Sequence, residues 1–108
     1  MATSNEIGFI HTVFFWLKDG VTEDEKKAFE KGMEALGQSP NIVKYYYGKP
    51  EGSDREVVDD SFDYSWIVHF KNSEDQARYQ NDDPIHDVFV EKFKHLWASV
   101  KVFDSVLI

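Results

Sequence analysis

The sequence predicts an α+β fold, with an antiparallel sheet that carries helices on one face. The run Ile7 to Leu17 has the length of a strand, and Phe62 to Phe70 alternates with the period of two typical of strands. Two capping patterns, at Thr22 and Ser73, predict helix starts after these strand-type segments and their turns. The resulting order is strand, helix, strand, strand, helix pair, strand, which is the βαββαβ order of the ferredoxin-like arrangement.

The first strand is apolar on both of its faces. A small antiparallel sheet normally buries one face and leaves the other in water, but neither face of this strand suits water. One layer of helices covers one face only, so we expect a second copy of the sheet to cover the other in a symmetric homodimer. At period two, one face holds Phe9, His11, Val13, Phe15 and Leu17, and the other holds Ile10, Thr12, Phe14 and Trp16.

The first predicted helix follows a turn at Lys18-Asp19-Gly20. Thr22-Glu-Asp-Glu25 is a capping box, because a threonine at the cap is followed three residues later by a glutamate. The helix is amphipathic and is expected to end near Gly37-Gln-Ser-Pro40. Its apolar stripe consists of Phe29, Met33 and Leu36.

Two strands and an acidic loop are predicted for the middle of the chain. Ile42 to Tyr47 is rich in β-branched and aromatic residues and is followed by the turn residues Gly48-Lys-Pro50. Glu51 to Ser61 is the loop, and Phe62 to Phe70 is the third strand. One face of that strand holds Tyr64, Trp66, Val68 and Phe70, and the other holds Ser65, Ile67 and His69.

The last part of the chain is predicted to hold two helices and the final strand. Ser73-Glu-Asp-Gln76 is a second capping box, which starts a short helix through Tyr79. Pro84 begins the next helix, because proline is favoured at the first helical position. Val100 to Leu107 is the final strand. The apolar stripe of the second helix is Ile85, Val88, Phe89, Phe93 and Leu96.

Composition bounds the classes of function. A chain of 108 residues suits a single domain, expected over residues 7–108 after a disordered tail at 1–6. The net charge of −8 argues against nucleic acid and anionic membranes as partners. The chain has no cysteine, which excludes disulfides and thiolate metal sites. With no leader-like segment or membrane-length apolar run, we expect a cytoplasmic protein.

Four short segments resemble motifs of a known family, and they follow one another in the order that is typical of that family. They are His11-Thr-Val-Phe-Phe-Trp-Leu-Lys18, Ser61-Phe-Asp-Tyr64, the tyrosine before the Pro84-Ile-His86 turn, and Val102-Phe-Asp104. Together they resemble the stress-responsive α/β-barrel family, called Dabb, which is part of the dimeric α+β barrel superfamily. The resemblance spans about His11 to Asp104.

The resemblance implies that two ferredoxin-like sheets pack face to face as a barrel, with a pocket between each sheet and its helices. A polyketide cyclase of this family closes a linear thioester by aldol chemistry without a cofactor. The essential residues of that cyclase resemble Tyr79, His86 and His11 of this chain. The resemblance therefore implies that these three residues are catalytic. This chain departs from the family pattern: Tyr79 and His86 are one residue further apart, with Asp83 where the first histidine stands. Met33 stands where the cyclase has a pocket tyrosine.

The residues themselves leave alternatives open. His86, in the first turn of a helix, suits a neutral general base, or it is a cap residue bonded to a neighbouring aspartate. His11 lies on an apolar strand face, where a core histidine with one hydrogen bond is the common case. Tyr79 suits a hydrogen-bond donor to a ligand oxygen, or a packed tyrosine with a surface hydroxyl. His69 is expected on the opposite sheet face, and His95 late on the last helix.

A set of apolar residues is predicted to bind a small apolar or aromatic ligand, and core packing explains the same residues. The acidic stretch Glu51 to Asp63 offers carboxylates to a hard cation, but calcium-loop spacing is missing, which favours a solvated loop. We expect no metal and no cofactor. The predicted ligand-binding residues are Val13, Phe15, Phe29, Met33, Trp66, Val68, Phe89, Trp97, Val100 and Val102.

Three functions remain open at this level. The first is a ligand-binding homodimer, with cofactor-free cyclase or lyase chemistry if it is catalytic. The second is a non-enzymatic, stress-associated dimer whose interior is filled by side chains. The third is a cofactor-independent monooxygenase of the same superfamily.

Overall fold

The computed structural model describes residues 6–108, so most of the tail expected at residues 1–6 lies outside the described residues. Within them, the four strands pair antiparallel in the order β2-β3-β1-β4, which confirms the predicted ferredoxin-like fold. The elements are β1 (Phe9–Leu17), α1 (Glu23–Leu36), β2 (Lys44–Gly48), β3 (Tyr64–Phe70), α2 (Ser73–Asp82), α3 (Pro84–Phe93), a 3₁₀ turn (Lys94–Leu96) and β4 (Trp97–Val106).

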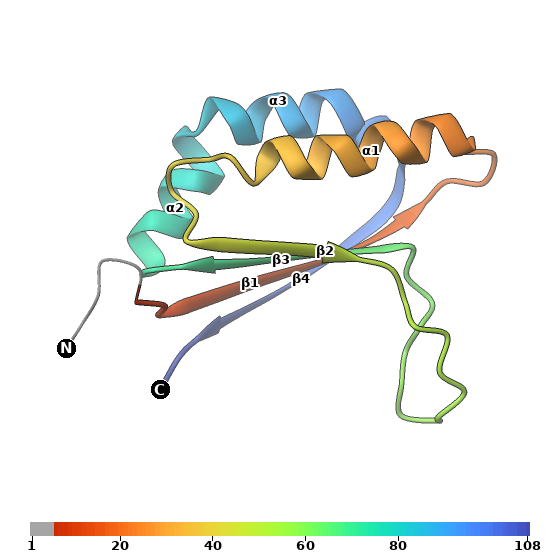
Figure 1. The fold of residues 1–108 in the computed structure, drawn as a ribbon, viewed down its shortest axis with the longest axis horizontal. Helices are drawn as coiled ribbons and strands as arrows, with labels where there is room; N and C mark the ends of the chain where they lie inside the picture. Colours follow the sequence, from red (N-terminus) through yellow and green to blue (C-terminus); the bar gives the residue numbers. More distant parts are fainter. Residues whose placement is uncertain (1–5) are drawn as a thin grey trace.

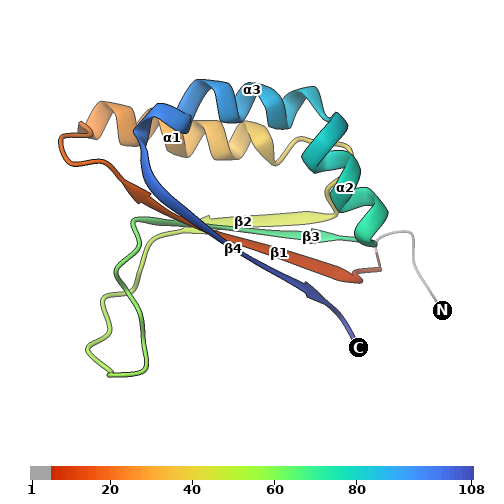
Figure 2. The ribbon, with the colours of Figure 1, turned by 180° about the vertical axis from the view of Figure 1, so that it is seen from behind.

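All three helices lie on one side of the sheet, as Figures 1 and 2 show from opposite directions. The strand residues that face them are buried because helix side chains cover them. The residues between them along β1 and β3 are only partly buried, so the predicted alternation is confirmed. The buried strand residues are Phe9, His11, Val13, Phe15, Tyr64, Trp66, Val68 and Phe70.

The capping box predicted for α1 is confirmed. The Glu25 N–H donates to Oγ1 of Thr22 at 3.1 Å, and the Thr22 N–H donates to a carboxylate oxygen of Glu25 at 2.9 Å. These bonds satisfy backbone donors that a helix start otherwise leaves unpaired. The predicted stripe of Phe29, Met33 and Leu36 is buried against the sheet.

The second predicted capping box is wrong. Asn72 rather than Ser73 caps α2, since its side chain accepts the Asp75 N–H at 2.8 Å. The helix also continues past Tyr79 to Asp82. In α3, Val88 was predicted in the buried stripe, but its side chain is 62% exposed. It lies on the outer side of the helix layer.

Three strands begin later in the chain than predicted, and one begins earlier. The Ile42 N–H bonds to the Ser39 carbonyl in a turn, so pairing with β3 starts only at Val43. β4 starts at Trp97 rather than Val100, because Trp97 already pairs with Leu17 across a register shift. As a result, His95 belongs to the 3₁₀ turn rather than to α3. β1 starts at Phe9 and β3 at Tyr64, each two residues later than expected.

The sheet face away from the helices, called the open face below, carries large apolar side chains. Phe14 packs against Phe62 and Phe103, with ring centroids 4.8 and 6.0 Å apart. Tyr46 is 44% and Phe103 53% exposed, so nothing within the described chain covers this face fully. The loop between β2 and β3 extends away on this side (Figures 1 and 2). The open face comprises Ile10, Thr12, Phe14, Trp16, Lys44, Tyr46, Ser65, Ile67, His69, Ser99, Lys101, Phe103 and Ser105.

Asp83 joins the helix layer to the turn after α1. Its carboxylate accepts hydrogen bonds from the Ile85 N–H at 2.9 Å, from the Asn41 amide at 3.1 Å and from the Ser39 hydroxyl. Burial raises the pKa of Asp83, but these hydrogen bonds, led by that from Ser39, lower it more, so the pKa lies below its usual 3.8. Asp83 therefore has a structural role as the α3 cap.

Replacing Asp83 by alanine is expected to lower the free energy of unfolding by about 2 kcal/mol, because Ser39 and the α3 start lose their acceptor. Asp82→Ala, at an exposed neighbour, is the control and should change it by less than about 0.5 kcal/mol. Since the folded-state pKa of Asp83 is lowered, its contribution is present above pH 3.8 and is lost as the pH falls through that lower value. Urea titrations at several pH values measure this; a pH-independent difference contradicts it.

Candidate functional site

A cavity of about 150 Å³ lies between the sheet and the helices. Its wall comes from β1, β3 and β4 on the sheet side and from all three helices on the other side. Most of the lining is apolar, and the polar groups are few and grouped. The lining residues are His11, Val13, Phe15, Leu36, Trp66, Tyr79, Gln80, His86, Phe89, Val90, Trp97, Val100 and Val102.

The structure brings the three predicted catalytic residues, His11, Tyr79 and His86, to this one cavity. Seven of the ten predicted ligand-binding residues also line it: Val13, Phe15, Trp66, Phe89, Trp97, Val100 and Val102. The other three, Phe29, Met33 and Val68, are fully buried in the core at 0% exposure and do not reach the cavity. There they pack the sheet against the helices.

His11 has an acidic partner that sequence reasoning missed. The register of β1 with β4 places it opposite Asp104, and His11 Nδ1 lies 2.5 Å from Oδ1 of Asp104. A proton on Nδ1 therefore donates to the carboxylate, which leaves Nε2 as the acceptor nitrogen of the ring. The two residues stand far apart in the sequence, and only the strand register brings them together.

Tyr79 lies between the two histidines. Its ring centroid is 4.7 Å from that of His86 and 6.1 Å from that of His11. The Trp66 indole N–H donates to the Tyr79 hydroxyl oxygen at 3.2 Å, which leaves the hydroxyl proton free to donate elsewhere. Burial raises the pKa of Tyr79, so the phenol is protonated at neutral pH. Tyr79 on α2 and His86 on α3 are in contact.

His86 lies in the first turn of α3, half-buried, with its ring against Tyr79. Burial lowers the pKa of His86, and the nearby carboxylates of Asp87 and Asp83 offset only part of this effect. Its Nδ1 is buried and has no hydrogen-bond partner among residues 6–108. The Trp97 indole nitrogen, also in the cavity wall, is unpaired in the same way. Unpaired buried nitrogens are unusual in proteins.

The cavity opens at the edge of the sheet. Gln80, Val100 and Val102 line it and are exposed, while the deeper residues His11 and Trp66 are buried. β4 is an edge strand, and the helix layer leaves much of its inner side uncovered. The exposed side of the cavity is therefore the β4 edge, and His11 lies on its buried side.

The remaining ionisable candidates lie elsewhere. His69 is on the open face next to Tyr46, with ring centroids 5.4 Å apart, and burial lowers its pKa. His95 is exposed in the 3₁₀ turn. In the described part of the chain, no group of three or more histidines and carboxylates is placed to hold a metal ion. No helix among residues 6–108 is long and apolar enough to span a membrane.

Comparison with protein families gives one match. The model described as "Stress responsive A/B Barrel Domain", or Dabb, matches residues 9–107. No curated protein matches the chain significantly.

Solved structures show the same fold at low identity. A dimeric ferredoxin-like protein of unknown function from Thermobifida fusca is 18% identical, covers 94% of this chain and 92% of its own, and has a TM-score of 0.78. A Dabb family protein from Mesorhizobium loti is 21% identical, with coverages of 94% and 98% and a TM-score of 0.73. The hydroxynitrile lyase from Passiflora edulis is 18% identical, with coverages of 96% and 95% and a TM-score of 0.81.

The lowered pKa of His86 is directly measurable. We expect nitrogen-15 NMR of the imidazole rings to show His86 neutral at pH 7 and half-protonated below pH 6.5, because burial disfavours the imidazolium. The unfolded chain then binds the proton more tightly than the folded chain, so His86 makes the free energy of unfolding fall as the pH drops below about 6.5. His86→Gln should remove that part of the pH dependence. A midpoint above 6.5 contradicts the account.

Proposed function

The chain belongs to the stress-responsive α/β-barrel (Dabb) family, and on that premise we propose a homodimer whose subunits each bind a small apolar or aromatic molecule in the cavity. There the protein catalyses cofactor-free removal of a proton next to a carbonyl group. One observation carries the proposal: two histidines and a protonated tyrosine converge on a single, mostly apolar cavity. Such a cavity with a few convergent polar groups is the usual form of a ligand site.

The open face supports the homodimer. All four strands contribute aromatic or aliphatic side chains to it, and such side chains are costly to leave in water. The neighbour from Thermobifida fusca is described as dimeric. The face also carries two lysines over aromatic rings, Lys44 over Tyr46 and Lys101 over Phe103, at 5.6 and 5.9 Å. In a face-to-face dimer the helices stay outside and each cavity stays within its own subunit.

The two unpaired nitrogens support a ligand with a polar group. The Trp97 indole N–H is a donor, and it suits a carbonyl oxygen. The neutral His86 ring supplies an acceptor for a proton close to that carbonyl. The surrounding valines and aromatic rings suit the apolar remainder of the molecule.

The chemistry assigns one role to each side chain. Neutral His86 takes the proton from the carbon next to the carbonyl, and the electron pair of the C–H bond moves to form an enolate. The Tyr79 hydroxyl donates a hydrogen bond to the enolate oxygen, which stabilises the charge as it develops. His11, held in one tautomer by Asp104, orients the substrate through Nε2. The enolate then attacks a second carbonyl or expels a leaving group, which gives cyclisation or lyase chemistry.

A second candidate reaction is the cleavage of a hydroxynitrile in the same cavity, and the name of the Passiflora edulis neighbour supports it. Here His86 takes the hydroxyl proton, the carbonyl double bond forms, and the bond to the nitrile carbon breaks to release cyanide. An interior filled by side chains, as expected for a purely structural dimer, is disfavoured by a cavity that contacts both His11 and His86. No observation favours the monooxygenase.

Proton exchange tests the chemistry. With phenylacetone in D₂O, the protein is expected to speed the loss of the substrate's α-proton NMR signals, and His86→Gln to slow this at least about 100-fold. His95→Gln, which replaces an exposed histidine outside the cavity, is the matched control and should leave the rate unchanged. Equal rates for both variants contradict the role of His86. A fall of several kcal/mol in the unfolding free energy of His86→Gln assigns that residue a structural role instead.

Sedimentation tests the dimer. Phe103→Glu places a charge on the open face and is expected to convert a dimer into a folded monomer of about half the mass. Val88→Glu adds the same charge on the outer side of the helix layer, where the residue is 62% exposed, and should leave the dimer intact. Identical masses for both variants contradict a dimer through this face.

A further inference from the structure

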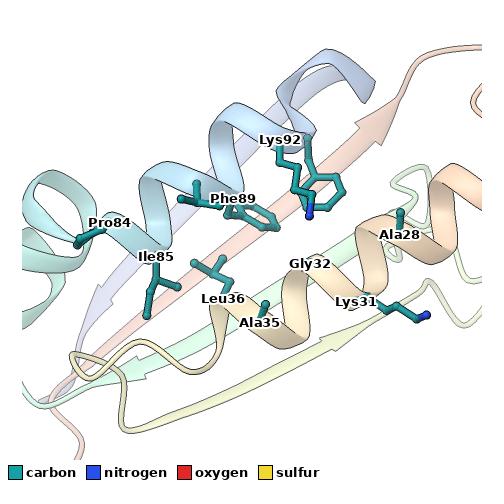
Figure 3. A pocket seen from close by; sticks show the side chains of 11 residues that line it. Ala28, Lys31, Gly32, Ala35, Leu36, Pro84, Ile85, Phe89 and Lys92 are labelled. Atoms are coloured by element: carbon teal, nitrogen blue, oxygen red, sulfur yellow. The ribbon is translucent and has the colours of Figure 1, made fainter.

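A second and larger hollow lies on the outside of the helix layer. It is a groove of about 510 Å³ between α1 and α3, shown in Figure 3. The groove was not predicted from the sequence, because Val88 was expected in the buried stripe of α3. In the structure Val88 is exposed and lies in the wall of the groove. In the proposed dimer the helices face outward, so the groove stays accessible.

The groove exists because α1 presents small residues to α3. Ala28, Gly32 and Ala35 follow one another along the α1 side, and none of them has a side chain long enough to reach α3. At Gly32 the Phe93 ring lies directly against α1, since a Cβ atom there would lie only 2.2 Å from that ring. Beyond this contact the wall is mainly aliphatic, with Ile85, Val88 and Leu36.

The charged residues in the groove wall are both lysines. Lys92 extends from α3 toward α1, with its ammonium over the Phe93 ring at 5.9 Å, whereas the Lys31 side chain leaves α1 on the side away from α3 (Figure 3). Neither forms an ion pair with a carboxylate in residues 6–108, although the chain carries 20 acidic residues. An apolar wall with the Lys92 ammonium beside it complements a molecule with an apolar chain and one negative charge.

The size of the groove decides between a small molecule and a protein. Only 11 residues line it, whereas a stable protein interface uses about 20–30 residues on each side. Its volume of about 510 Å³ lies within the range of roughly 300–1,000 Å³ found for small-molecule sites. A carboxylate with an alkyl chain fits both the size and the charge.

We propose that the groove between α1 and α3 binds a medium-chain carboxylate, with the alkyl chain along Ala28, Gly32 and Ala35 and the carboxylate at Lys92. This site is separate from the cavity that holds His11 and His86. The two hollows share only Leu36 and Phe89 as wall residues. Binding in the groove therefore needs none of the groups proposed for catalysis.

Calorimetric titration with octanoate, decanoate and dodecanoate, each below its micelle concentration, tests the proposal. We expect the dissociation constant to fall by up to about fourfold per added methylene, because burying one methylene is worth about 0.8 kcal/mol. Lys92→Gln should weaken decanoate binding about fivefold, and Lys31→Gln less, since an exposed ion pair contributes little. Lys27→Gln, at an exposed α1 lysine outside the groove, is the control and should have no effect.

Two further measurements identify the site. In NMR, decanoate should shift the signals of Ala28, Ala35 and Val88, and Ala35→Trp should abolish binding by filling the groove. Decyltrimethylammonium, with the same chain and the opposite charge, should bind far more weakly than decanoate.

Several results would overturn the proposal: no decanoate binding, equal binding by the cationic analogue, or shifts confined to Val100 and Val102 at the mouth of the inner cavity. His86→Gln should leave decanoate affinity unchanged. The proposal for the groove and the proposal for the inner cavity can therefore be tested independently of each other.

Discussion

The structure depends on one constraint: β1 is an inner strand that is apolar on both faces. It pairs with β3 on one side and β4 on the other, so its backbone is satisfied within the sheet. One face presents Val13 and Phe15 to the helices, and the other presents Phe14 to the open side. A single helix layer buries only the first of these, which leaves the second for another molecule. The cavity, its histidine and the open face are all consequences of this strand.

Burial also determines the charge state of the site. The same apolar surroundings lower the pKa of His86 and raise that of Tyr79, so an uncharged base and an uncharged acid lie in contact at neutral pH. His11 has a carboxylate partner, because the edge strand places Asp104 beside it. Desolvation therefore shifts the pKa values of two side chains at the site, His86 and Tyr79, in opposite directions.

Much of the fold was predictable because local rules determine it. The period of two in β1 and β3 and the Thr22 capping box act over a few residues, and the structure confirms them. The features that were missed depend on contacts between distant segments. Asp104 meets His11 only through strand register, and Val88 is exposed because the small residues of α1 leave a groove beside it. The Asn72 cap was missed because Asn and Ser serve almost equally well as caps.

The central claim is that a second copy of the chain covers the open face. Isotope-filtered NMR on a sample assembled from labelled and unlabelled chains tests this claim most directly, because it detects only contacts between molecules. The account predicts intermolecular signals from the side chains of Ile10, Phe14 and Ile67, all on the open face. A folded protein that gives no such signals and sediments as a single 12.6 kDa chain would contradict it.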